Sequence, residues 1–143
     1  MRAGLQQAVP FNQHLGLEIV ELSLGRGVVR LPDDGSLRNH VGSQHASALF
    51  AVGQAASGAA LATAFAEHLE AVEPLAEAAE VSYRQIARGP ITATAVLGAT
   101  PDELLADLDD AGEIRFAIDV SLTDGAANVV AEMTVRWLVR QED

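Results

Sequence analysis

Residues 39–66 of this chain read NHVGSQHASALFAVGQAASGAALATAFA, and none of these 28 residues is Asp, Glu, Lys or Arg. Ten alanines lie between positions 46 and 66, and Gln54, Ser57 and Thr63 interrupt the apolar residues. The length alone would allow a membrane-spanning helix. The segment is mostly alanine with few large apolar side chains, so we predict a soluble helix over residues 44–68 that is buried on most sides.

Segments typical of strands lie on both sides of this helix. Alternating and β-branched residues predict two short strands between positions 15 and 31, with the turn at Gly25 and Gly27. Four further strands are expected over residues 80–87, 91–99, 114–123 and 128–140. Pro74 is expected to end the helical region. The acidic segment 101–113 is expected to be an exposed connection with a helical turn at 102–108.

Six strands and one apolar helix predict an α+β fold in which a curved antiparallel sheet wraps around the helix. We expect a single domain over residues 1–143, with a short N-terminal helix or arm over residues 1–14 and the core over residues 15–143. A nearly charge-free helix needs cover on several sides, and a sheet has free edges. We therefore expect a homodimer that pairs sheet edges, or a tetramer of two such dimers. Gly53, Ser57 and Gly58 would permit close approach to the helix.

Charge and composition exclude several partners and chemistries. The chain has 143 residues, 20 acids against nine arginines, no lysine and a net charge of −11, which argues against nucleic acid and anionic membranes as partners. Cysteine is absent, which excludes disulfides, thiolate metal sites and cysteine nucleophiles. The four histidines lack metal-ligand spacing and no dinucleotide-binding glycine pattern occurs, so neither metal nor cofactor is expected. No signal-peptide pattern begins the chain, and a cytoplasmic location is expected.

The most informative segment, residues 39–50, is a loop with an asparagine and two histidines that opens the long helix. The first N–H groups of a helix have no partner within the helix and carry partial positive charge. A carbonyl oxygen or an oxyanion is stabilised there. Ala46 and Ser47 have small side chains, so a ligand could approach their amides.

Asn39, Gly42, His45 and Ala46 match the pattern Asn-x-x-Gly-x-x-His-Gly/Ala-Gly, with Ser47 in place of the last glycine. With this motif the sequence resembles the hotdog-fold acyl-CoA thioesterases, most closely the PaaI-like group and the family known as DUF4442. The order of the elements agrees, and the resemblance covers about residues 12–139. Residues 81–83 and 87–89 also resemble the family's next strand and turn. The resemblance implies a hotdog fold and hydrolysis of an acyl-CoA or another acyl thioester.

The resemblance also implies roles for single residues. The backbone N–H of Ala46 would hold the thioester carbonyl, Asn39 would orient the water or the thioester, and His45 would fix the loop and polarise the carbonyl. A helix carboxylate nine residues after the histidine would be the base or nucleophile, and Gln54 occupies that position. The residues expected to bind substrate are Gly42, Ser47, Ser57, Tyr83, Gln85 and Arg88, the last through coenzyme A phosphates.

Gln54 is the main departure from the family pattern. A neutral amide is a poor base and a poor nucleophile, and loss of a positioned base costs about 10²–10⁴ in rate. Glu67 lies 13 residues further on, about 20 Å along a helix, so it cannot replace the carboxylate from the same helix. A carboxylate from a partner subunit is one remaining source of a base.

Three hypotheses about function therefore stay open. The first is an acyl-CoA thioesterase in which Gln54 orients water. The second is a non-catalytic protein of the same fold that binds acyl-CoA or lipid, and the third is a structural dimer without a small ligand. Single residues also have structural alternatives: Asn39 as a turn cap, His45 as a structural histidine, and Gln54 as an amide paired across a dimer.

Overall fold

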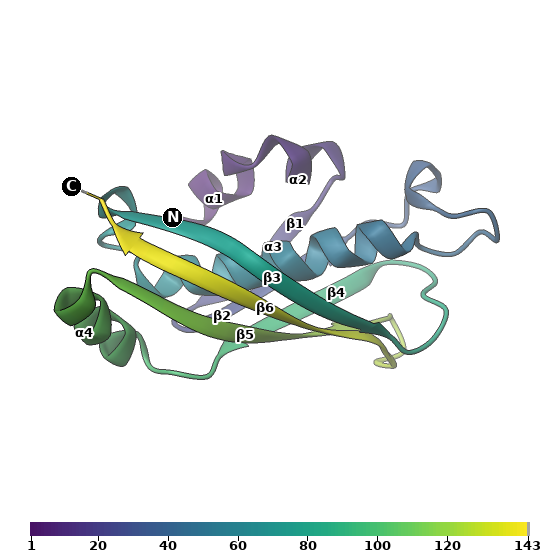
Figure 1. Cartoon of the computed structure of the whole chain (residues 1–143). Coiled ribbons are helices and arrows are strands. Elements are labelled where there is room, and N and C mark those ends of the chain that lie inside the picture. Colours follow the sequence, from purple (N-terminus) through teal and green to yellow (C-terminus); the bar gives the residue numbers. More distant parts are fainter. Residues whose placement is uncertain (143) are drawn as a thin grey trace.

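A six-stranded antiparallel sheet curves around one long helix in the computed structural model, which describes residues 1–142 (Figure 1). The strand order in the sheet is β1-β2-β4-β5-β6-β3. The elements are β1 (Glu18–Ser23), β2 (Arg26–Leu31), the helix α3 (Ala46–Ala64), β3 (Val72–Tyr83), β4 (Ile91–Leu97), β5 (Glu113–Thr123) and β6 (Val129–Gln141). The predicted α+β fold, a sheet wrapped around one helix, is confirmed, and it is the hotdog arrangement that the resemblance implies.

The alanine-rich helix α3 forms the centre of the core. Val52, Ala56 and Ala60 are fully buried, and the helix packs mainly against β2 and β4. Its length and hydropathy would suffice to cross a membrane, but most of its residues are buried inside the sheet. The helix is shorter than the predicted 44–68, because His45 caps its start and the chain turns after Ala64, with Phe65 fully buried at the end of the core.

Strand β3 begins eight residues earlier than the predicted strand over residues 80–87, and it includes Pro74. The expectation that Pro74 ends a helical segment is therefore wrong. Proline lacks the N–H that a central strand needs, but it is tolerated in an edge strand. Strand β3 is such an edge, because it pairs only with β6, where Pro74 lies opposite Val139. Its other edge, twelve residues long, is open in the single chain.

The acidic segment forms the helix α4 (Pro101–Ala111), which is longer than the helical turn expected at 102–108. Leu104 and Leu108 lie one turn apart and are both buried, so this helix has an apolar face against the sheet. A capping box between Thr100 and Glu103 starts the helix, and the left-handed Gly112 ends it. The acids therefore lie on and beside a docked helix rather than on a solvated loop.

Gly27 lies inside β2, opposite Ala95 of β4, and not in the turn where the sequence placed it. The turn itself is made by Gly25, whose φ is +78°. A Cβ atom on Gly27 would meet the Ala60 nitrogen at 2.7 Å and the Ala56 oxygen at 2.8 Å. The close approach of β2 to the backbone of α3 therefore depends on a glycine of the strand.

Replacing Gly27 by alanine is expected to lower the free energy of unfolding by about 1–3 kcal/mol, because the added methyl meets helix backbone that cannot rotate away. Gly58→Ala is the matched control, since a Cβ there meets only the Trp137 ring, at 3.8 Å. Alanine favours a helix over glycine by about 0.5–1 kcal/mol, so this control should be slightly stabilised. Urea unfolding measures both, and a Gly27→Ala protein as stable as wild type would contradict the close approach.

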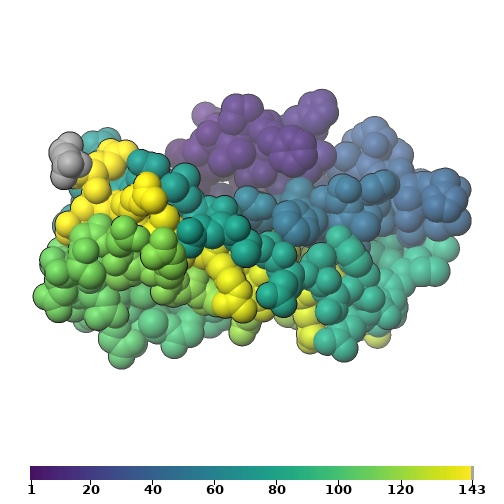
Figure 2. Space-filling view, in the orientation of Figure 1, coloured from purple at the N-terminus to yellow at the C-terminus, as the bar shows by residue number. Residues whose placement is uncertain are grey.

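Two short helices, α1 (Arg2–Ala8) and α2 (Pro10–His14), form the predicted N-terminal arm. They lie across α3 on the side away from the sheet and make a separate layer (Figures 1 and 2). Polar bonds tie α1 to β1: the Arg2 guanidinium donates to the Ile19 carbonyl at 2.7 Å, and Gln6 bonds both Leu17 O and Ile19 N at 2.7 Å. These bonds also cover the free edge of β1, which would otherwise expose unpaired backbone groups.

Candidate functional site

The loop before α3 is held by the side chain of Asn39. Its Oδ1 accepts from the N–H groups of Val41 and Ser43 at 3.0 and 3.1 Å, and its Nδ2 donates to the Ser43 hydroxyl at 2.8 Å. Gly42 has a φ of +80°, a conformation that favours glycine. In the single chain the Asn39 amide is thus engaged in shaping the loop, which is the turn-capping role considered from the sequence.

Gln44 anchors this loop to the rest of the fold, and nothing in the sequence indicated this role beyond its place in the motif. It is 4% exposed, and its Nε2 donates to the carbonyls of Pro32 and Gly89 at 3.0 and 2.9 Å. Its Oε1 is buried without a hydrogen-bond partner among the described residues. One side chain therefore connects the end of β2, the start of α3 and the connection that leads into β4.

Just before the loop, the carboxylate of Asp34 caps the N-terminus of the short 3-10 helix Gly35–Leu37. It accepts from the Ser36 N–H at 2.9 Å and from the Ser36 hydroxyl at 2.8 Å. The bond from the Ser36 N–H, and after it the bond from the Ser36 hydroxyl, hold the pKa of the Asp34 carboxyl below its ordinary value. The chain is thus fixed on both sides of the motif.

Gln44→Met should lower the free energy of unfolding by about 2 kcal/mol, because it keeps the size of the side chain but removes two hydrogen bonds to carbonyls. Gln85→Met is the matched control: Gln85 is exposed and its Nε2 makes one bond, to the Val129 carbonyl at 3.1 Å. Its loss should cost about 0.5 kcal/mol or less. Urea titration of both variants tests this, and equal stabilities would show that Gln44 does not anchor the loop.

His45 is the N-cap of α3, and its Nδ1 accepts from the Ser47 N–H at 2.9 Å. The N–H groups of Ala48 and Leu49 donate to the His45 carbonyl. Among residues 1–142, none accepts a hydrogen bond from the Ala46 N–H. The structure therefore leaves one amide of the first turn available, that of Ala46, whereas the sequence also suggested that of Ser47.

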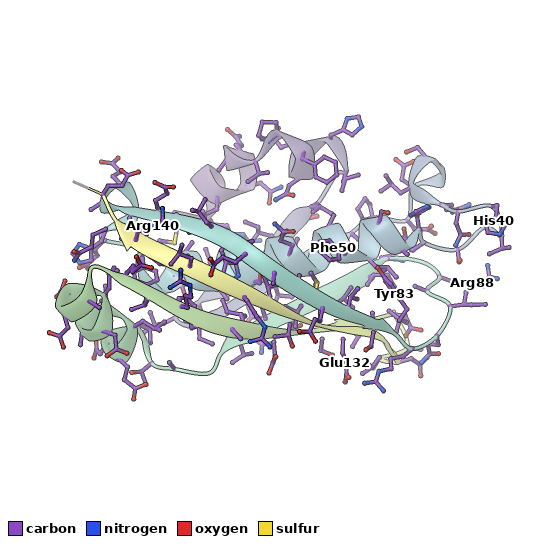
Figure 3. All side chains as sticks on the ribbon, viewed as in Figure 1. His40, Phe50, Tyr83, Arg88, Glu132 and Arg140 are labelled. Atoms are coloured by element: carbon purple, nitrogen blue, oxygen red, sulfur yellow. The ribbon has the colours of Figure 1, made fainter. Side chains whose placement is uncertain are left out.

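A pocket of about 310 Å³, here called the loop pocket, lies on one side of this first turn. Its lining includes Asn39, Gln44, Ala46, Tyr83 and Gln85. The Tyr83 hydroxyl donates to the Ala46 carbonyl at 3.1 Å, so the end of β3 is joined to the start of α3 (Figure 3). Four of the predicted site residues are thus brought together here from segments more than 35 residues apart.

A larger cavity of about 490 Å³, here called the α3 chamber, lies on the other side, between α3 and the N-terminal helices. Ser47 and Gln54 line it, whereas Ser57 lines neither cavity. Ser57 is fully buried, donates to the Gln54 carbonyl at 2.7 Å and accepts from the Trp137 indole N–H at 3.2 Å. Gln54 and Trp137 both line the chamber, so Ser57 contacts it only through these two neighbours.

Arg88 lies exposed in the turn after β3, at the same end of the molecule as His40 (Figure 3). Within the described part of the chain it makes no ion pair, whereas six of the nine arginines do. Gly42, His45 and Arg88 line neither cavity. No group of three or more His, Asp or Glu side chains able to hold a metal ion occurs within residues 1–142.

Six of the predicted site residues line two cavities that lie on either side of the first turn of α3, and the other four line neither. Asn39, Ala46, Tyr83 and Gln85 face the loop pocket, while Ser47 and Gln54 face the α3 chamber. Ala46, whose N–H is free, lines the loop pocket, and the next residue, Ser47, lines the α3 chamber. An oxygen placed there would bind to a helix N-terminus, where partial positive charge stabilises developing negative charge.

Comparisons with known proteins agree with this architecture. A model of the family described as "Domain of unknown function (DUF4442)" matches residues 1–139. A Pseudomonas aeruginosa protein of unknown function, PA5026, named a probable thioesterase, is 28% identical, with 99% of this chain and 93% of that one covered and a TM-score of 0.87. No curated protein matches this chain significantly.

Two further structures show the fold alone, because their sequence identity is low. The Escherichia coli PaaI protein from the phenylacetic acid degradation operon is 17% identical, covering 99% of this chain and 90% of that one, with a TM-score of 0.74. A mutant of the Staphylococcus aureus thioesterase SAV0944 is 18% identical, covering 92% and 99%, also with a TM-score of 0.74.

Proposed function

This chain belongs to the DUF4442 family, and from that premise we propose that it hydrolyses an acyl thioester, such as an acyl-CoA, whose carbonyl lies at the N-terminus of α3. The observation that carries the proposal is the Ala46 N–H, which has no hydrogen-bond partner among residues 1–142 and belongs to a residue that lines the loop pocket, next to Ser47 of the α3 chamber. The resemblance to a structure named a probable thioesterase supports the same chemistry.

In the proposed reaction, water adds to the thioester carbonyl carbon, the C–S bond breaks, and a carboxylic acid and a thiol leave. The negative charge on the carbonyl oxygen is stabilised by the Ala46 N–H and by the positive end of the α3 dipole. The Nδ1 of His45 is occupied by the Ser47 N–H, which leaves its Nε2 to donate toward the carbonyl. Asn39 keeps the loop in the required shape through its three hydrogen bonds.

Gln54 supplies orientation rather than base catalysis in this proposal. Its amide lines the α3 chamber two turns after Ser47 and can hydrogen-bond a water molecule there. An amide cannot accept a proton usefully, so turnover is expected to be slow, lower by about 10²–10⁴ than with a positioned carboxylate. The thiol portion of the substrate extends over the loop pocket, where Tyr83 and Gln85 contact it and the unpaired Arg88 reaches coenzyme A phosphates.

The proposed molecule is a cytoplasmic homodimer, or a tetramer of two dimers. The open edge of β3 is twelve residues long, and unpaired edges of this length are usually covered. Two of its three acids, Glu77 and Glu80, are ion-paired with Arg115 and Arg136, which reduces repulsion between two copies of this strand. Sedimentation should give about twice 15.0 kDa or a multiple of it; a particle of one chain mass would refute the dimer.

The direct test is thiol release from a panel of acyl-CoA esters, measured against the same esters without protein. Release above the spontaneous rate supports the proposal. The panel should include short, long and aryl acyl groups, since the loop pocket does not define the acyl portion. If no ester is cleaved faster than in buffer, hydrolysis by this chain is ruled out.

A second candidate is a non-catalytic protein that binds acyl-CoA, and Gln54 is the residue that favours it. Calorimetry with the same esters separates the two candidates. Binding without thiol release would support the binding protein, and release by the unmodified chain would exclude it.

A further inference from the structure

The α3 chamber has a lining that suits hydrocarbon. Of the described residues that line it, none is charged, and most are apolar, including Leu5, Phe11, Phe50 and Trp137. Gln6, one of its few polar residues, has its amide engaged with β1 through both its oxygen and its nitrogen. Water gains little in such a cavity, whereas apolar groups are stabilised in it.

Helices α1 and α2, which cover the chamber on the side opposite α3, are held at a distance from that helix. Helices α1 and α2 contain no buried residue, and Phe11 is 59% exposed although it borders the cavity. The polar bonds of Arg2 and Gln6 fix α1 on the edge of β1 rather than on α3. The N-terminal arm therefore covers α3 without filling the space beneath it, and the apolar side chains of the arm gain cover when a ligand occupies that space.

The dimensions of the chamber favour a linear chain. It follows α3 from Ser47 to Ala59, twelve residue steps or about 18 Å at 1.5 Å per residue. A zigzag of about 1.5 Å bonds advances roughly 1.25 Å per carbon, so this length holds on the order of 14 carbons. At about 30 Å³ for a group the size of water, the volume of about 490 Å³ holds on the order of 16 such groups.

We propose that the α3 chamber binds the acyl portion of the substrate and selects linear aliphatic chains of roughly 10 to 14 carbons. This inference rests on the proposed function, because it takes the thioester carbonyl to lie at Ala46. The chain enters beside Ser47, passes Phe50 and Gln54, and ends between Gly58, Trp137 and the N-terminal arm. Short chains leave the far end of the chamber empty, and compact aryl groups fill the width of the chamber but not its length.

S-alkyl thioethers of coenzyme A test the inference, since they carry the chain but cannot be hydrolysed. Each methylene buried should tighten the dissociation constant about fourfold, until the chamber is full at roughly 10 to 14 carbons. Calorimetry over chains of 4 to 18 carbons should therefore show a steep fall that levels off. A dissociation constant independent of chain length would overturn the inference, and is the result expected if a second copy of the chain fills the chamber.

Gly58→Leu gives a second, positional test. A Cβ at Gly58 meets only the Trp137 ring, at 3.8 Å, so the fold accepts a side chain that enters the far end of the chamber. The plateau should move to shorter chains by about four carbons, and 12-carbon thioethers should bind at least tenfold more weakly, with 4-carbon ones unchanged. Gly4→Leu is the matched control, because a Cβ on Gly4 of α1 meets nothing within 4 Å and Gly4 does not line the chamber.

Thioester hydrolysis and binding of the acyl chain in the α3 chamber can be refuted independently of each other. A chain-length plateau without thiol release from any ester would refute hydrolysis and leave the chamber assignment intact. Thiol release with a flat thioether series would refute the chamber and leave hydrolysis intact. If Gly58→Leu and Gly4→Leu give the same plateau as wild type, the acyl chain does not reach the far end of α3.

Discussion

Replacing Gln54 with glutamate is expected to raise the rate of thioester hydrolysis by about 10²–10⁴, which is the usual contribution of a positioned general base. Gln54 lines the α3 chamber two turns after Ser47, and glutamate keeps its length while adding a group that accepts a proton from water. The gain should appear in kcat, because ground-state binding of the substrate is little changed. Thiol release from a 12-carbon acyl-CoA, compared between wild type and Gln54→Glu, measures it.

Gln54→Met is the control for this gain, because it keeps the size of the side chain without either an amide or a carboxylate. It should bind thioethers as wild type does and show no increase in rate. A folded Gln54→Glu protein that binds the thioether but hydrolyses no faster than wild type would show that this position does not face the attacking water.

Ala46→Pro is expected to lower kcat by about 10²–10³, the usual cost of removing one donor to an oxyanion. Proline has no N–H, so the substitution deletes the group that the proposed mechanism depends on and little else. Ala46 is the first residue of α3, a position where proline is favoured. The preceding His45 has φ −67° and ψ 140°, the extended conformation that a following proline requires.

Ala46→Ser is the matched control, since it keeps the backbone N–H and is also a small residue. It should retain nearly all activity, whereas Ala46→Pro should lose it with an unchanged unfolding midpoint. Testing both in the Gln54→Glu background gives the range needed to observe a hundredfold loss. Equal activity of the proline and serine variants would place the thioester carbonyl elsewhere.

The parts of the fold that depend on residues close together in the sequence could be predicted from local patterns. The charge-free, alanine-rich segment predicted the central helix, and alternating residues predicted the strands. Pro74 misled the prediction because its effect depends on whether a strand lies at an edge, which only the pairing of β3 with β6 decides. The capping box of Thr100 and Glu103 was present in the sequence and would have indicated the full length of α4.

In the candidate site, too, the local features could be predicted from the sequence, and the long-range contacts could not. Asn39, Gly42, His45 and Ala46 act within one loop and one helix turn, so their short spacing already indicated a shaped loop with an amide at its end. Gln44 was missed because the carbonyls that it binds, those of Pro32 and Gly89, lie 12 and 45 residues away. Ser57 was expected at the substrate, but its buried hydroxyl bonds the Gln54 carbonyl and the indole of Trp137, which is 80 residues distant.

A buried helix, its N-terminal motif and a glutamine in place of a carboxylate could all be predicted from the sequence, because each depends on residues close together in the chain. Only the folded structure shows that the Ala46 amide stays free beside the loop pocket, and that an apolar chamber lies beside α3. Both features depend on where segments that are far apart in the sequence lie in the folded chain. Tyr83 reaches the start of α3, and the bonds of Arg2 and Gln6 hold the N-terminal arm on β1, away from the helix that it covers.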